Sequence, residues 1–115
     1  MIIRGEALEQ KIVEKPRDGR GRAIMMAYDA AAGFAGEIGI IAMMQVEPDS
    51  EIGYHKHEDD MEMYLILDGI PRVNDNGTME VLNPGDLLIT KKGESHGLIN
   101  DTAEPVTFLA MILKH

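Results

Sequence analysis

The chain has 115 residues, a net charge of −9 at pH 7 and no cysteine. This length fits a single domain with its own hydrophobic core. The absence of cysteine excludes disulfides and thiolate metal ligands, so any metal site must use histidine, aspartate or glutamate. The negative charge argues against nucleic acid and anionic membranes as partners.

The N-terminal segment is charged throughout and lacks the apolar core of a signal peptide. No apolar run approaches the roughly 20 residues that a membrane-spanning helix needs. We therefore expect a cytoplasmic protein with no membrane partner.

Short apolar runs separated by turn-forming residues recur along the chain, and no helical apolar stripe persists beyond the first dozen residues. Residues 1–35 are predicted to form an N-terminal strand and loop, with an apolar run at 22–28 and turn formers from residue 31. The barrel is predicted over 38–113, with strands at 38–46, 61–67, 86–90 and 105–113. Asn76-Gly77 is typical of a tight hairpin and Pro84-Gly85 of a type II turn. The sequence thus predicts one all-β domain over residues 1–115, an antiparallel sandwich or barrel.

The run at 61–67 is apolar on both faces, unlike a strand with one face in water. Because alternate residues of a strand share a face, one side carries Met63, Leu65 and Leu67, and the other carries Glu62, Tyr64 and Ile66. One face is predicted to line the barrel interior, and the other to pack on a second sheet or a partner subunit. Two polar residues within these runs are candidates for lining a pocket, Tyr64 and Gln45. Their alternative roles are a structural tyrosine and a strand-edge glutamine.

Two of the four histidines, His55 and His57, are separated by one residue. On a strand both imidazoles face the same side, where their nitrogens can reach one ion. Glu62 lies five residues further, an odd spacing that would put it on the opposite face of a continuous strand. The acidic residues 58–60 can form a turn or bulge that returns Glu62 to the histidine side. A carboxylate at the start of an apolar strand needs a cation or hydrogen-bond donors.

A third histidine, His96, enters another short apolar segment after the next hairpin. Taken singly, these features have simpler interpretations: a surface histidine pair, a glutamate paired with arginine, and a histidine in a turn. Together, His55, His57, Glu62 and His96 predict a site for one divalent transition metal: Fe, Mn, Ni, Co, Cu or Zn. Such a site can leave ligand positions open.

At these positions the sequence resembles the cupin superfamily. The first cupin motif, G-x5-H-x-H-x3-4-E-x6-G, is matched by His55, His57, Glu62 and Gly69, with Asp49 in place of the first glycine. The second, G-x5-P-x-G-x2-H-x3-N, is matched by Gly85, Gly93, His96 and Asn100, with Lys91 in place of proline. Neither departure affects a predicted metal ligand; both concern local turn geometry.

The resemblance implies a single-domain cupin, a jelly-roll-like antiparallel double-stranded β-helix. It also implies a barrel of six to eight strands, a metal near its mouth and a homodimer that shares edge strands. Cupins host many reactions, so the fold does not identify one.

The predicted function is action on a small organic molecule through the three-histidine, one-glutamate metal site. Oxygenase-like or lyase-like chemistry is favoured over sugar isomerisation, and no catalytic residue is assigned. The alternatives are a metal-dependent sensor that binds a small molecule without turnover, and a barrel whose metal has a structural role. Open coordination positions would favour an enzyme or a sensor.

Overall fold

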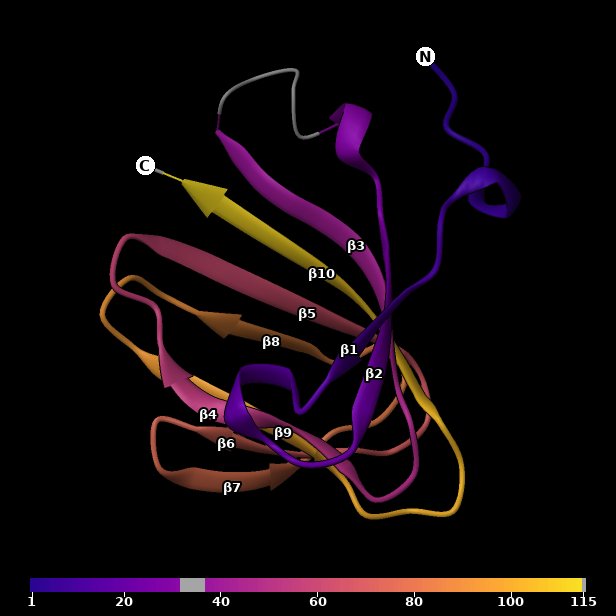
Figure 1. Cartoon of the computed structure of the whole chain (residues 1–115). Coiled ribbons are helices and arrows are strands. Elements are labelled where there is room, and N and C mark those ends of the chain that lie inside the picture. Colours follow the sequence, from indigo (N-terminus) through magenta and orange to yellow (C-terminus); the bar gives the residue numbers. More distant parts are fainter. Residues whose placement is uncertain (32–36, 115) are drawn as a thin grey trace.

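The computed structural model describes residues 1–31 and 37–114, and its strands form two antiparallel sheets (Figure 1). The larger sheet has the order β1-β2-β3-β10-β5-β8. Its strands are β1 (Lys11–Glu14), β2 (Arg22–Ala27), β3 (Ile38–Val46), β10 (Val106–Lys114), β5 (Asp60–Asp68) and β8 (Leu87–Thr90). The smaller sheet has the order β4-β9-β6-β7. It is built from β4 (Ser50–Lys56), β9 (Ser95–Asn100), β6 (Arg72–Asp75) and β7 (Thr78–Val81).

Two short 3₁₀ helices accompany the strands, η1 (Gly5–Ala7) and η2 (Pro16–Asp18). The two sheets face each other, come together at the right of Figure 1 and diverge at the left. The prediction of an all-β domain is confirmed. The described residues contain ten strands rather than six to eight, because β1 and β2 extend the larger sheet beyond β3. The predicted turn region that begins at residue 31 lies mostly outside the described residues.

The apolar runs coincide closely with strands of the larger sheet. The run at 38–46 is β3, and the run at 61–67 lies within β5, which is longer by one residue at each end. Asn76 and Gly77 both have positive φ, and they connect β6 to β7 as the hairpin prediction requires. Gly85 also has a positive φ, and Asp86 N–H donates to the Asn83 carbonyl oxygen, which closes the predicted type II turn.

The inner face of β5 carries Glu62, Tyr64 and Ile66, all buried, so the predicted alternation is correct. The main core lies between the sheets and includes Phe108, Leu98 and Val46, each fully buried. The outer face of β5 is half-buried to exposed, as are alternate residues of the edge strand β8. A partner subunit over this outer face stays a prediction.

Both departures from the cupin motifs have local explanations. Asp49 adopts φ of 56°, a left-handed conformation that suits glycine and that aspartate tolerates better than most residues. Lys91, unlike proline, has a backbone N–H, and this group donates to the Glu94 carboxylate at 2.8 Å. The turn that precedes His96 is therefore closed by a side chain of this sequence.

No helix within residues 1–31 and 37–114 has the length and apolar character to cross a membrane.

Candidate metal centre

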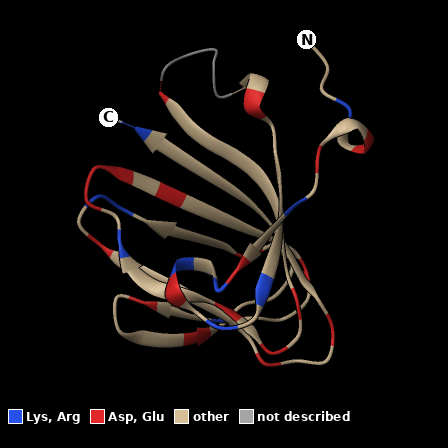
Figure 2. Cartoon of the chain, viewed as in Figure 1, with Lys and Arg blue, Asp and Glu red and all other residues tan. Residues whose placement is uncertain are grey.

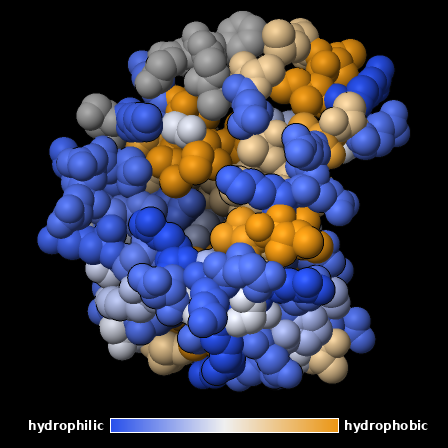
Figure 3. Space-filling model, viewed as in Figure 1, coloured by the Kyte–Doolittle hydropathy of each residue, from blue (hydrophilic) through white to orange (hydrophobic). Residues whose placement is uncertain are grey.

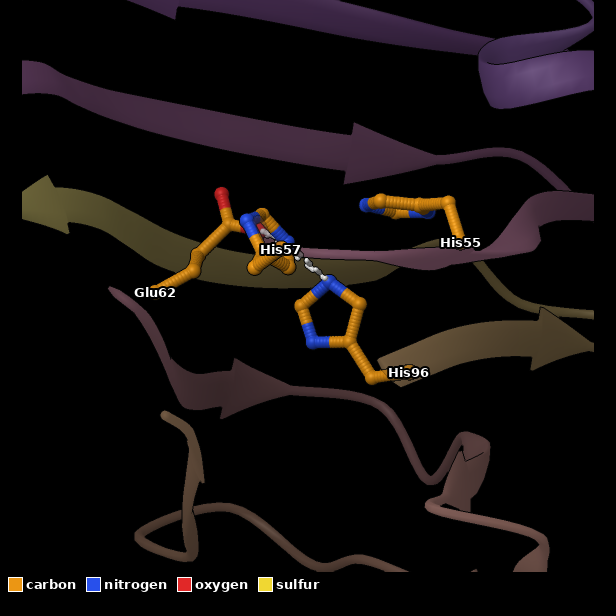
Figure 4. Close-up of side chains that lie close together, drawn as sticks. All are labelled: His55, His57, Glu62 and His96. Atoms are coloured by element: carbon orange, nitrogen blue, oxygen red, sulfur yellow. Dashed lines mark hydrogen bonds and ion pairs between the residues drawn. The ribbon is translucent and has the colours of Figure 1, made fainter. Parts of the chain in front are cut away.

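Four side chains from three strands and the β4–β5 turn meet near the end where the sheets diverge: His55, His57, Glu62 and His96, here called the His/Glu cluster (Figure 4). His55 extends from β4, His57 follows the end of β4, Glu62 comes from β5 and His96 from β9. One ligand atom from each residue lies within 4.8 Å of the other three. The structure therefore brings together all four residues that the sequence predicted as metal ligands.

The turn between β4 and β5 explains how an odd spacing places Glu62 on the histidine side. β4 belongs to the smaller sheet and β5 to the larger one, so the chain changes sheets at residues 57–59. The inner faces of two facing sheets point toward each other. Glu62 therefore points at the histidines from the opposite sheet.

Three of the four donor atoms form a close triangle. His57 Nε2 and His96 Nε2 are 3.1 Å apart, and each lies 3.1 Å from Glu62 Oε1. His57, His96 and Glu62 are all buried, whereas His55 is half-buried. Two imidazole nitrogens and a carboxylate oxygen thus converge away from water.

Each histidine has its Nδ1 held by an oxygen. His57 Nδ1 lies 2.7 Å from Asp60 Oδ1, and His55 Nδ1 lies 2.6 Å from the Gly53 carbonyl oxygen. Carbonyl and carboxylate oxygens accept, so these two nitrogens carry a proton, and Nε2 of the neutral ring has the lone pair. His96 Nδ1 lies 2.6 Å from the hydroxyl of Thr90, which is fully buried and able to accept in the same way. This arrangement is typical of metal-binding histidines.

Burial and hydrogen bonds shift the pKa values of three residues in the cluster. Burial lowers the pKa of His55 to about 4, and the neighbouring His96 acts in the same direction. Burial alone would raise the pKa of Glu62, but hydrogen bonds with His57 and His96 outweigh it and lower the pKa to about 2. The hydrogen bond with Glu62 raises the pKa of His57. The cluster therefore contains the ionised carboxylate of Glu62 beside His57 Nε2, a nitrogen that can bind either a proton or a metal ion.

Tyr64 packs against the His/Glu cluster. Its ring lies 4.7 Å from the His96 ring and 4.3 Å from the Phe108 ring, measured between centroids. Burial, together with the Glu62 charge, raises the pKa of Tyr64 well above its ordinary value. Tyr64 therefore keeps its proton, and its contacts suit the structural role.

A cavity of about 450 Å³ opens beside the cluster and is lined by His55, His57, Glu62 and Tyr64, among others. Tyr64 is thus found where the sequence predicted it. Gln45 is not: it lines a different cavity together with Asp68 and Thr107. Alternation explains this, because the residues of β3 that line the cavity are Ile40, Ala42 and Met44.

Sequence reasoning missed three residues of the site. For the acidic residues 58–60 the sequence favours a solvated turn, with support of the metal ligands as the alternative, and Asp60 makes such a contact with His57 Nδ1. Thr90 lies six residues before His96, but the sequence does not show that the two strands face each other. Arg17 belongs to a basic stretch for which the sequence favours a solvated loop over an anion-binding arm, and it lies far from the histidines in the chain.

A sequence profile of the cupin domain matches residues 42–112. The chain belongs to the cupin family. A Thermotoga maritima cupin relative named "Oxalate-binding protein" is 31% identical over 113 residues, covering 98% of this chain and 93% of the relative. These matches include the whole His/Glu cluster.

Solved structures show the same cupin fold. A Thermotoga maritima structure described as a predicted oxalate decarboxylase has a TM-score of 0.94 and 30% identity, with 100% of both chains covered. A sugar phosphate isomerase of the cupin superfamily from Silicibacter pomeroyi has a TM-score of 0.81 and 21% identity, covering 100% of this chain and 76% of that one. At this lower identity the likeness concerns the fold alone.

Proposed function

We propose that this cupin binds one divalent transition metal at His55, His57, Glu62 and His96, and that the metal binds a small organic acid. The observation that carries the proposal is the triangle of His57 Nε2, His96 Nε2 and Glu62 Oε1, with 3.1 Å between each pair. With their Nδ1 atoms held by oxygens, the histidine nitrogens turn lone pairs toward one another and toward a carboxylate. Such a group is unfavourable without a cation at its centre.

The spacing of the triangle supports an ion that accepts more than four ligands. Two donors about 2.1 Å from one ion are roughly 3.0 Å apart at a right angle and roughly 3.4 Å apart at a tetrahedral angle. The distances of 3.1 Å are nearer to the right angle. With His55 as the fourth donor, a six-ligand shell would have two positions left for oxygens of an organic acid.

When bound, the metal would supply a Lewis acid that polarises oxygens of the organic acid. The chain's own residues hold the donors in place: Asp60 orients His57, Thr90 orients His96, and Tyr64 packs against the His96 ring. The adjoining cavity gives the ligand room next to the cluster. The relatives named for oxalate support an acid as the ligand class.

The bound acid is either converted to a product or bound without turnover. We favour turnover of the lyase or oxygenase type, because the cluster adjoins a cavity large enough for a substrate. Binding without turnover is the second candidate, and one observation favours it. Tyr64 keeps its proton, and no histidine among the described residues remains outside the His/Glu cluster to act as a general base.

Elemental analysis of protein purified without a histidine tag tests the metal site. We expect about one transition metal per chain in the wild type and none in His57→Ala. Tyr54→Ser is the matched control, since Tyr54 lies on β4 three residues before His57 but is exposed, and it should retain the metal. Far-UV circular dichroism checks that both variants are folded. A folded His57→Ala protein with full metal content would remove His57 from the site.

Turnover is tested separately with metal-loaded protein and an organic acid that it binds. Proton NMR over several hours should show the acid disappear and products form. A bound acid that stays unchanged, with metal present throughout, would support the second candidate.

A further inference from the structure

The cavity beside the His/Glu cluster has two chemically different walls. Histidines and carboxylates come from β4, from the β4–β5 turn and from the start of β5. The rest of the lining is mostly apolar and comes from β2, β3 and β10, which continue the larger sheet from β5, namely Met25, Ile40, Ala42, Met44, Ala110 and Ile112. Figure 3 shows an apolar area over the left parts of β3 and β10, with hydrophilic residues beside and below it.

Strand register explains why the cavity lies there. Ala42 pairs with Ala110, and Ala110 pairs with Tyr64, so two alanines lie side by side on the inner face of the sheet. Further along the same strands, Phe108 and Val46 are fully buried and fill the space between the sheets. The small side chains leave open the volume that large ones occupy at the other end.

The cavity is large for the ligand that the relatives are named after. Oxalate has six non-hydrogen atoms, which fill roughly 180 Å³ even at the ~30 Å³ that a water molecule occupies in the liquid. The cavity measures about 450 Å³. An oxalate ion at the metal would leave most of the apolar wall uncovered.

A positive charge stands at the cavity on the N-terminal loop. Arg17 lines the cavity, and its guanidinium makes no ion pair within residues 1–31 and 37–114. Three residues of this loop, Lys15, Arg17 and Asp18, adopt positive φ between 45° and 62°. Such strained backbone tends to occur at ligand sites. Gly53 has no side chain at the point where the loop crosses β4, and an added Cβ would overlap the Arg17 carbonyl oxygen.

Negative charges line the same opening. Glu58 and Asp59 on the β4–β5 turn are exposed and face the cavity. Figure 2 shows acidic residues along the β4–β5 turn and basic residues on the loop around η2. One anionic group can pair with Arg17, whereas a second would lie near these carboxylates, where the exposed Lys56 at the end of β4 is the other lining cation.

We infer that the ligand is a monocarboxylic acid with an apolar body, larger than oxalate. The carboxylate lies between the metal site and Arg17, and the body lies on the wall of Ala42, Met44 and Ala110. At about 30 Å³ per non-hydrogen atom the cavity has room for about 15 such atoms. This inference rests on the proposed function, because the metal anchors the acid.

The test is a binding titration of metal-loaded protein with 2-oxo acids of increasing length. Pyruvate, 2-oxobutanoate and 2-oxohexanoate carry one negative charge and the same pair of chelating oxygens, so only the apolar body changes. Each added methylene that is buried should tighten binding by up to about fourfold. We expect 2-oxohexanoate to bind at least about tenfold more tightly than pyruvate.

Two variants separate the parts of the inference. Met44→Gln should reduce the affinity ratio of 2-oxohexanoate to pyruvate by at least about threefold, because it makes the apolar wall polar and leaves the groups that hold the carboxylate in place. Met43→Gln is the matched control, since the next residue of β3 does not line the cavity, and it should preserve the preference. Arg17→Ala should weaken both acids by about tenfold without changing their ratio.

The metal content is measured first, so that a failure of the proposed metal site can be told apart from a failure of the inference about the ligand. Protein that holds no metal would overturn the proposed function. With metal bound, equal affinities across the series, or tighter binding of oxalate than of 2-oxohexanoate, would overturn only the inference about the ligand. An unchanged preference in folded, metal-loaded Met44→Gln would do the same.

Discussion

His96 and Asn100 lie four residues apart on β9, and both are fully buried. Asn100 Nδ2 donates to the carbonyl oxygens of Val46 and Glu104 at 3.0 and 2.8 Å, and its Oδ1 accepts from Thr102. His96 Nδ1 is likewise paired, with Thr90, but its Nε2 faces another imidazole nitrogen and a carboxylate oxygen.

The contrast separates a buried residue whose hydrogen bonds are all made within the protein from one that we propose binds a metal. The hydrogen bonds of Asn100 are completed within the protein, so this residue ties β9 to the end of β3. Thr90 orients the His96 ring through Nδ1. His96 Nε2 instead faces His57 Nε2 and the Glu62 carboxylate, and all three groups can bind the same cation. Burial and a shared motif are therefore common to both residues, and the partners of each atom decide its role.

The largest difference is expected between the alanine variants of His96 and Asn100. His96→Ala should reduce metal affinity by more than about 100-fold, beyond the range that residues outside the ligand set reach. Asn100→Ala should keep about one metal per chain and lower the free energy of unfolding by about 2–3 kcal/mol, because buried carbonyls lose their donor. Metal titration and urea denaturation of both variants measure these quantities. Loss of metal from folded Asn100→Ala would abolish the contrast.

A smaller effect is expected from the hydroxyls that serve each residue. Thr90→Val removes the partner of His96 Nδ1 while keeping the side chain's shape, and it should weaken metal binding by about 10–100-fold. Thr102→Val removes a hydrogen bond to Asn100 and should leave metal affinity unchanged. Competition with a chelating indicator gives both affinities. Equal affinities in the two variants would show that Thr90 does not orient His96.

The smallest effect on metal affinity is expected from lowering the pH. The hydrogen bond with Glu62 raises the pKa of His57 above the ordinary 6.5, so a proton competes with the metal there already above pH 6.5. The pKa of His55 is about 4 and that of Glu62 about 2, so neither takes up a proton near pH 6.5. Metal affinity should therefore fall by about tenfold per pH unit below the pKa of His57.

Affinities measured between pH 5.5 and 8 check this slope. A fall of about a hundredfold per pH unit near pH 6.5 would mean that a second group of the cluster takes up a proton there.

Local sequence signals determined much of the larger sheet and the turns. Strands β3, β5 and β10 are long and apolar, so their runs are visible without knowledge of their partners. Asn76, Gly77 and Gly85 mark turns because their backbones tolerate positive φ. The four cluster residues were predictable for a similar reason: their types and spacings are chemical requirements of a metal site. Strands β1, β6 and β7 are short and carry several polar residues, and only pairing with neighbours makes them strands.

Tertiary structure alone decided which other groups surround the cluster. Alternation along a strand loses its phase at every turn, so the sequence could not exclude Gln45 from the cavity or place Arg17 beside it. Thr90 meets His96 because β8 and β9 lie in opposite sheets that face each other. The same packing sets the two alanines of β3 and β10 side by side and opens the cavity. The residue types and spacings of the His/Glu cluster can thus be read from the sequence. The cavity beside the cluster and the charges around it depend on how distant strands pair and face each other.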